Sequence, residues 1–232
     1  MMKIMMIEGR YKGKINLSGL DVSILPKNIG LVTTVQFLDF VDEIKKYLEI
    51  NGKGIFIDKI KQKYEGQLLG CDIGGAEKIK DEVDAFLYIG TGKFHPLGIA
   101  LNVDKEVFCY EPINAILSKI HKSEVEMYNK KRRSAYMKFL ETEEIGILVS
   151  LKPGQNNFRK AVELKKQLKD KNCYIFVFDT LDFNQIENFP FIQCWVNTAC
   201  NRILDDYEKF RKPLVDMNSI PFDAIIAKNT NN

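Results

Sequence analysis

The stretch Ile29-Gly-Leu-Val-Thr-Thr34 decides the fold of this chain, together with its later counterpart Ile145-Gly-Ile-Leu-Val-Ser150. Both are short apolar runs without the alternation of a half-exposed strand, which is typical of strands buried on both faces of a parallel sheet. Each run precedes a segment with helical spacing and then another apolar run. The sequence therefore predicts an α/β fold made of two consecutive, pseudo-repeated βαβ domains with mostly parallel sheets.

The remaining elements are expected to follow these two runs in order. In the first unit we expect strands at 29–35, 54–59, 85–89 and 104–110, helices at 37–49 and 76–83, and mostly helix over 113–140. In the second we expect strands at 146–150, 174–179 and 191–196, helices at 157–169 and 201–213, and a turn or short helix at 181–189. The predicted domains are 28–140 and 141–220, preceded by a lone strand at 3–8 with a linker to 27 and followed by a tail at 221–232.

The composition excludes several classes of protein. With 45% hydrophobic and 28% charged residues, the 232-residue chain is expected to fold. Its 34 Lys and Arg nearly balance 31 Asp and Glu, so the net charge of +3 indicates no direct nucleic-acid binding. The basic cluster at 130–133 is expected to be a solvated helix face, with contact to RNA or an acidic partner as the alternative. No membrane span or signal peptide is evident, so we expect a cytoplasmic protein.

The cysteines offer the first sign of chemistry. They are Cys71, Cys109, Cys173, Cys194 and Cys200. Their odd number and irregular spacing argue against a disulfide framework, so each is a buried small hydrophobe, a reactive thiol or a metal ligand. Cys71 and Cys200 each follow an apolar segment of their own unit. If both thiolates faced one cleft, they would favour zinc or an iron–sulfur cluster.

Two loops that follow predicted strands could bind an anion. The first, Gly90-Thr-Gly-Lys-Phe-His95, has glycines that free backbone N–H groups, with Lys93 to assist. Its spacing matches neither a P-loop nor the dinucleotide GxGxxG pattern, and a tight turn is the alternative. The second loop, Lys152-Pro-Gly-Gln155, could bind the polar end of a small molecule through Lys152 and Gln155, or could be an ordinary turn.

Together, four segments of this chain resemble the archaeal 2-(3-amino-3-carboxypropyl)histidine synthase family of diphthamide biosynthesis. They are Gly66-Gln-Leu-Leu-Gly-Cys71, Asp84-Ala-Phe-Leu-Tyr-Ile-Gly-Thr-Gly-Lys-Phe-His-Pro-Leu-Gly98, Lys152-Pro-Gly-Gln155 and Trp195-Val-Asn-Thr-Ala-Cys-Asn-Arg202. Their order and approximate spacing agree with the family over residues 29–213.

The resemblance implies a three-domain, pseudo-repeated α/β protein, often a homodimer, in which one cysteine from each domain holds a [4Fe-4S] cluster. Cys71 matches the second ligand and Cys200 the third. S-adenosylmethionine binds the open iron, and its reductive cleavage yields a 3-amino-3-carboxypropyl radical that adds to a histidine of translation elongation factor 2. The expected cofactor-binding residues are Gly90, Thr91, Gly92, His95, Lys152 and Gln155.

This sequence departs from the family at two points. Most of the family's first domain, with its cluster cysteine, is missing before Met1, so residues 1–27 are expected to be a remnant of that domain with a linker. In addition, Asn201 stands where proline is usual after the last ligand. The third ligand is expected from a separately encoded first domain or a homologous subunit, with Cys194 as the internal alternative. Two other functions stay open: a non-catalytic accessory or scaffold subunit of the same system, and a cluster-free α/β enzyme that binds an anionic metabolite.

Overall fold

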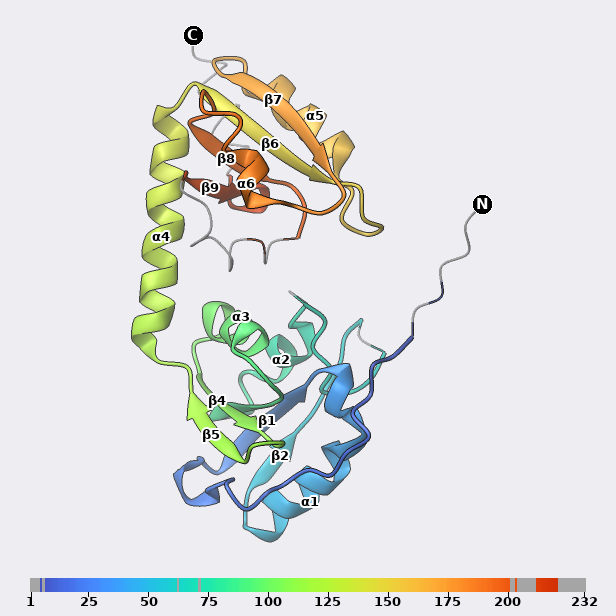
Figure 1. Cartoon of the computed structure of the whole chain (residues 1–232). Coiled ribbons are helices and arrows are strands. Elements are labelled where there is room, and N and C mark those ends of the chain that lie inside the picture. Colours follow the sequence, from blue (N-terminus) through green and yellow to red (C-terminus); the bar gives the residue numbers. More distant parts are fainter. Residues whose placement is uncertain are drawn as a thin grey trace. The chain divides into compact units, whose positions relative to one another are not determined.

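The computed structural model describes residues 5, 7–61, 63–70, 72–200, 203 and 212–220. The chain separates into two compact units, Met1–Val125 and Glu126–Asn232. The boundary falls within helix α4, Lys122–Glu141. Each unit contains one mostly parallel sheet covered by helices, which confirms the predicted fold class (Figure 1).

The first unit is built on a five-stranded sheet in the order β2-β1-β3-β4-β5. The strands are β1 (Asn28–Thr33), β2 (Gly54–Phe56), β3 (Ala85–Ile89), β4 (Glu106–Glu111) and β5 (Ile116–Lys119). The first four run parallel, and β5 pairs antiparallel with β4. Its helical elements are the 3₁₀ turns η1 (Val22–Ile24) and η2 (Val35–Phe40) and the helices α1 (Val41–Ile50), α2 (Gly74–Ile79) and α3 (Phe94–Asn102).

Successive side chains along the strands of the first unit point to opposite faces of the sheet, so its core has two layers. On one face, Leu31 and Leu87 pack in the same cluster as Ile44 of α1. On the other face, Phe86 packs with Ile79 of α2 and with residues of α3. Because successive strand residues point to opposite faces, both sides of this sheet are apolar and need helices, and Figure 1 shows α1 on one side with α2 and α3 on the other.

The second unit holds a four-stranded, fully parallel sheet in the order β7-β6-β8-β9. The strands are β6 (Glu144–Ser150), β7 (Asn172–Phe178), β8 (Cys194–Asn197) and β9 (Leu214–Asp216), and the other elements are α5 (Phe158–Gln167), α6 (Phe183–Ile186) and η4 (Met217–Ser219). Ile147 packs with Phe139 of α4 and Leu164 of α5 on one face. Leu148 and Trp195 pack on the other face, beside α6.

Several elements differ from the predictions in ways that have local causes. Residues 113–140, expected to be mostly helix, begin with β5, whose alternating exposure marks a half-buried edge strand. The strand β9 was not predicted, because three residues carry too little pattern. Of the predicted strand 3–8 the structure describes residues 5, 7 and 8, and these do not form a strand; the predicted helix 201–213 lies largely outside the described residues. None of the described helices is long and apolar enough to cross a membrane.

Candidate functional site

The loop that carries Cys200 is held by buried hydrogen bonds at the carboxyl end of β8. The Asn197 amide donates from Nδ2 to the Cys200 carbonyl (2.8 Å) and accepts at Oδ1 from the Ala199 N–H (3.0 Å). The hydroxyl of Thr198 donates to the Leu148 carbonyl on β6 (2.7 Å). Asn197 is only 1% exposed. Its bond from the Ala199 N–H and the Thr198 bond are buried, and its bond to the Cys200 carbonyl is partly buried, so together they fix the path of the backbone up to Cys200.

The predicted loop around Lys152 and Gln155 lies at the same edge of this sheet. Asn157 donates from Nδ2 to the Thr198 carbonyl (2.7 Å) and thereby joins this loop to the Cys200 loop. Within the loop, the Gln155 N–H donates to the Lys152 carbonyl (3.0 Å), and Gly154 adopts a φ of +79°. The Lys152 side chain is exposed and that of Gln155 is half-buried. The second unit therefore brings Lys152, Gln155 and Cys200 to one sheet edge, as parallel sheets do with ligand-binding loops.

Asp216 is a polar member of this edge that the sequence analysis missed. It ends β9 in register with Asn197 and is only 5% exposed. Its Oδ1 accepts from the Asn218 N–H (2.8 Å). Burial raises the pKa of Asp216, and the Asn218 and Asn197 amides and the charge of Arg132 counteract that rise. An aspartate at the end of an apolar run could have been noticed, but its contact with β8 depends on the strand order.

The four described cysteines fall into two classes. Cys109, Cys173 and Cys194 are buried, and burial raises the pKa to about 12 for Cys109 and Cys194 and to about 11 for Cys173. Such thiols stay protonated at neutral pH and are poor metal ligands. Cys200 is half-buried and follows the end of its strand. Cys71 lies outside the described residues.

The described residues on either side of Cys71 lie at the carboxyl end of β1. The Leu68 N–H donates to the Thr33 carbonyl (2.7 Å), and the Thr33 N–H donates to the Gly66 carbonyl (2.8 Å). Leu69 and Asp72 exchange two backbone hydrogen bonds (3.3 and 2.8 Å). The bonds to Thr33 anchor the segment before residue 71 to the first sheet, and the Leu69–Asp72 pairing ties the residue after position 71 back to that segment.

The glycine loop that follows β3 leads into α3. Gly90 is buried, and a Cβ there would lie 2.4 Å from the Tyr88 hydroxyl, whereas Gly92 has a φ of +72° and open space around it. Thr91 is exposed. His95 belongs to α3 rather than to the loop, and its ring stacks on Tyr88 with a centroid distance of 5.9 Å.

The charge of Lys93 is already paired within the first unit. Its Nζ lies 2.8 Å from Glu124 Oε2, and this ammonium lowers the pKa of Glu124. The loop can therefore offer the backbone amides around Gly92 to an anion more readily than the Lys93 side chain. Assistance from Lys93 in anion binding stays a prediction.

An iron–sulfur cluster needs accessible thiolates on backbone that does not move when the cluster binds, and Cys200 fits that requirement. Cys194 does not, because it opens β8, is fully buried and has a raised pKa. Within the ranges that the structure describes, no three His, Cys, Asp or Glu side chains gather closely enough to hold a metal ion.

Comparison with known proteins identifies similar chains. The family model for diphthamide synthesis proteins matches residues 16–228. The 2-(3-amino-3-carboxypropyl)histidine synthase of Pyrococcus horikoshii is 32% identical over 84% of this chain and 56% of its own, and that of Methanocaldococcus jannaschii is 33% identical over 81% and 49%. Subunit 1 of the synthase from Schizosaccharomyces pombe is 30% identical over 88% and 48%. The chain thus spans about half the length of these relatives.

Solved structures agree with this similarity. The crystal structure of Dph2 from Pyrococcus horikoshii matches with a TM-score of 0.74 and 28% identity, covering 88% of this chain and 60% of that one. The structure of the same protein with a 4Fe-4S cluster matches with a TM-score of 0.70 and 28% identity, covering 86% and 60%.

Proposed function

This chain belongs to the diphthamide synthesis family, and from that premise we propose that it is a component of a [4Fe-4S] enzyme. The reaction would transfer a 3-amino-3-carboxypropyl group from S-adenosylmethionine to a histidine of translation elongation factor 2. The observation that carries the proposal is the contrast between Cys200, half-buried on a loop fixed by hydrogen bonds, and the three buried, protonated cysteines. Similarity to a structure solved with a 4Fe-4S cluster supports it.

In this proposal Cys71 and Cys200 are two of the cluster ligands, and residues 28–140 and 141–220 correspond to the second and third family domains. When bound, the cluster supplies the electron for reductive cleavage of S-adenosylmethionine. The third thiolate would come from a separately encoded first domain or a homologous subunit. Cys194 is a poor substitute, since burial keeps its thiol protonated.

The chain's own residues would orient the ligands and the substrate. Asn197 and Thr198 would hold the Cys200 backbone in place as the cluster binds. Lys152, which forms no ion pair with any residue that the structure describes, would bind the carboxylate of S-adenosylmethionine, with Gln155 beside it. The amides of Thr91 and Gly92 would supply further donors, and His95 would line their loop. Gly90, whose own N–H donates to the Tyr110 carbonyl (3.0 Å), would fix the start of that loop.

A second candidate function is that of an accessory subunit, which retains the fold but docks to a complete synthase or to the elongation factor. Several relatives are named as subunit 1 of the synthase, which favours an assembly of unlike chains. A homo-oligomer of this chain would be another form of assembly, besides pairing with a separate first domain or with a homologous subunit. The two candidate functions differ in whether this chain contributes thiolates to a cluster.

Anaerobic reconstitution separates the candidates. The chain is incubated with iron and sulfide, alone and with the first domain of an archaeal synthase, and iron, acid-labile sulfide and EPR spectra are measured. We expect a stable cluster only with the added domain, lost in Cys71→Ala and Cys200→Ala but kept in the matched control Cys173→Ala. A full cluster in the isolated chain that decreases in Cys194→Ala would contradict the proposed ligand set. Binding of the added domain without any cluster would favour the accessory subunit.

A further inference from the structure

The outer edge of β2 leaves backbone groups without a neighbouring strand. β2 is the first strand of its sheet and pairs only with β1 among the described strands. The Gly54 N–H donates to the Lys27 carbonyl (2.8 Å) on the β1 side. Because hydrogen-bonding groups alternate along a strand, Ile55 turns its N–H and C=O away from β1, and Ile57 does the same where the chain continues extended. Residues 54–58 are all half-buried.

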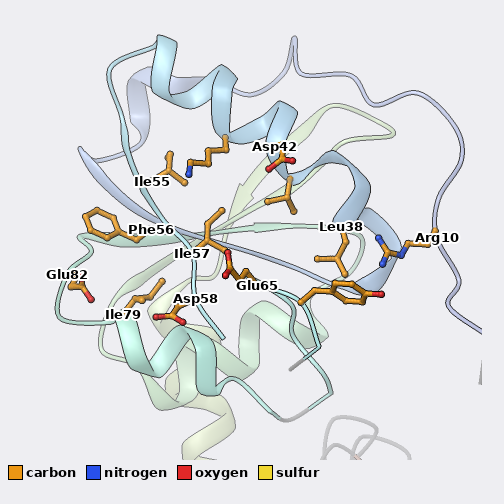
Figure 2. Close-up of a pocket in the computed structure, with 13 residues that line it drawn as sticks. Arg10, Leu38, Asp42, Ile55, Phe56, Ile57, Asp58, Glu65, Ile79 and Glu82 are labelled. Atoms are coloured by element: carbon orange, nitrogen blue, oxygen red, sulfur yellow. The ribbon is translucent and has the colours of Figure 1, made fainter. Parts of the chain in front are cut away.

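A pocket of about 460 Å³ lies along this edge. Figure 2 shows Ile57 in its middle, Ile55 and Asp42 toward α1, and Ile79 and Glu82 on the opposite side. Leu38 and Val41 add apolar surface on the α1 side. At one end, Arg10 lies 4.7 Å over the ring of Tyr64. The pocket therefore combines apolar and charged side chains next to backbone groups that no described strand pairs.

The charged side chains around the pocket determine which kind of segment can bind there. Two cations line the pocket: Arg10 is paired with Glu8 (2.8 Å) and with Asp39, and Lys45 lies 3.8 Å from Glu49. Asp58 is paired with Lys78 (2.6 Å).

Three other carboxylates that line the pocket have no paired cation among the described residues. Asp42, Glu65 and Glu82 are exposed, and none forms an ion pair with a residue that the structure describes. The rim therefore carries uncompensated negative charge on both sides of β2. A cationic segment would meet opposite charges on either side of the strand, while an acidic one would be repelled.

We propose that this edge is a docking site for an extended, lysine- or arginine-bearing segment of a partner protein. The segment would add as a strand beside β2, with its backbone bonded to Ile55 and Ile57, its apolar side chains in the pocket and its cations at Asp42 and Glu82. Backbone pairing supplies affinity in this mode of recognition, and alternate side chains supply specificity. The three-residue length of β2 limits the ladder to a few hydrogen bonds, so the interaction is reversible.

The probe is a short fluorescent peptide of alternating lysine and valine, and binding to the full chain is followed by anisotropy. We expect it to bind and to slow hydrogen exchange at the Ile55 and Ile57 amides. A glutamate–valine peptide should bind at least tenfold more weakly. The lysine–valine peptide with every backbone nitrogen methylated should lose binding, because neither of its edges can donate hydrogen bonds to a strand.

Charge-reversal variants test the part of the proposal that concerns the acidic side chains. Asp42→Lys and Glu82→Lys should each weaken binding about three- to tenfold, and the matched control Glu163→Lys, an equal charge change on α5, should not. Equal binding of the two peptide types, binding without protection at Ile55, or no binding at all would overturn the proposal. A concentration-dependent dimer that protects the same amides and is lost in Ile55→Pro would assign the edge to a second copy and would also overturn it.

Discussion

Replacing Asn197 by alanine should loosen the Cys200 loop and destabilise the second unit. The change removes the donor to the Cys200 carbonyl and the acceptor for the Ala199 N–H. The second of these bonds is buried, and a buried donor left without a partner costs about 1–3 kcal/mol. The Cys200 carbonyl is only partly buried and can reach water, so losing its hydrogen bond from Asn197 adds about 1 kcal/mol to this cost. The free energy of unfolding should therefore fall by about 2–4 kcal/mol.

Trp195 makes this change measurable in one unit. It is the only tryptophan, it is fully buried, and it lies on β8 just before Asn197, so its emission in a urea titration reports on the second unit. Asn188→Ala is the matched control, because that side chain is exposed and its loss should change stability by less than about 0.5 kcal/mol. If Asn197→Ala and the control had the same effect, the hydrogen bonds of Asn197 would not be what holds the loop.

Four further tests address other parts of the structure. At pH 8, iodoacetamide should modify Cys200 in the native protein well before the three buried cysteines, as peptide mass spectrometry would show; equal rates would contradict the assigned burial. Because the folded-state pKa of Asp216 is raised, the folded protein loses stability as pH rises from about 4 through that pKa. In urea titrations, the free energy of unfolding of Asp216→Asn should therefore equal that of the wild type near pH 4 and exceed it near pH 7. Gly146→Ala should destabilise the second unit by about 1–3 kcal/mol, since its Cβ would lie 2.4 Å from the Trp195 ring, and an unchanged urea midpoint would argue against that packing. Gly92→Val, at a φ of +72° with open space, should keep the fold at a cost of about 1–2 kcal/mol while calorimetry on a cluster-loaded assembly shows weaker S-adenosylmethionine binding.

The sequence predicted the parts of the fold that depend on local pattern. The apolar run 85–89 coincides with β3, and the run that begins at Ile145 lies within β6, because central parallel strands are apolar on both faces. The start of α3 was hidden by the glycines before it and by Pro96. Proline is tolerated in the first turn of a helix, where its missing N–H costs no hydrogen bond, so Pro96 did not mark a boundary.

The polar network around Cys200 could not be predicted, because it depends on strand order. Asn197 meets Asp216 only because β9 pairs with β8, and Thr198 reaches Leu148 only because β6 lies on the other side. Asp216 and Leu148 lie far from Asn197 and Thr198 in the sequence and share no motif with them. The same holds for the pocket along β2, which joins side chains of α1, β2 and α2 that no spacing rule connects.

The most direct test of the proposed function is transfer to the protein substrate. The chain, reconstituted anaerobically with the first domain of an archaeal synthase, is incubated with S-adenosylmethionine, a reductant and unmodified elongation factor 2, which is then digested for mass spectrometry. We predict a 3-amino-3-carboxypropyl group on one histidine, absent when Cys200→Ala replaces the wild-type chain and retained with Cys173→Ala. Modification that persists undiminished in Cys200→Ala would contradict the role given to this chain.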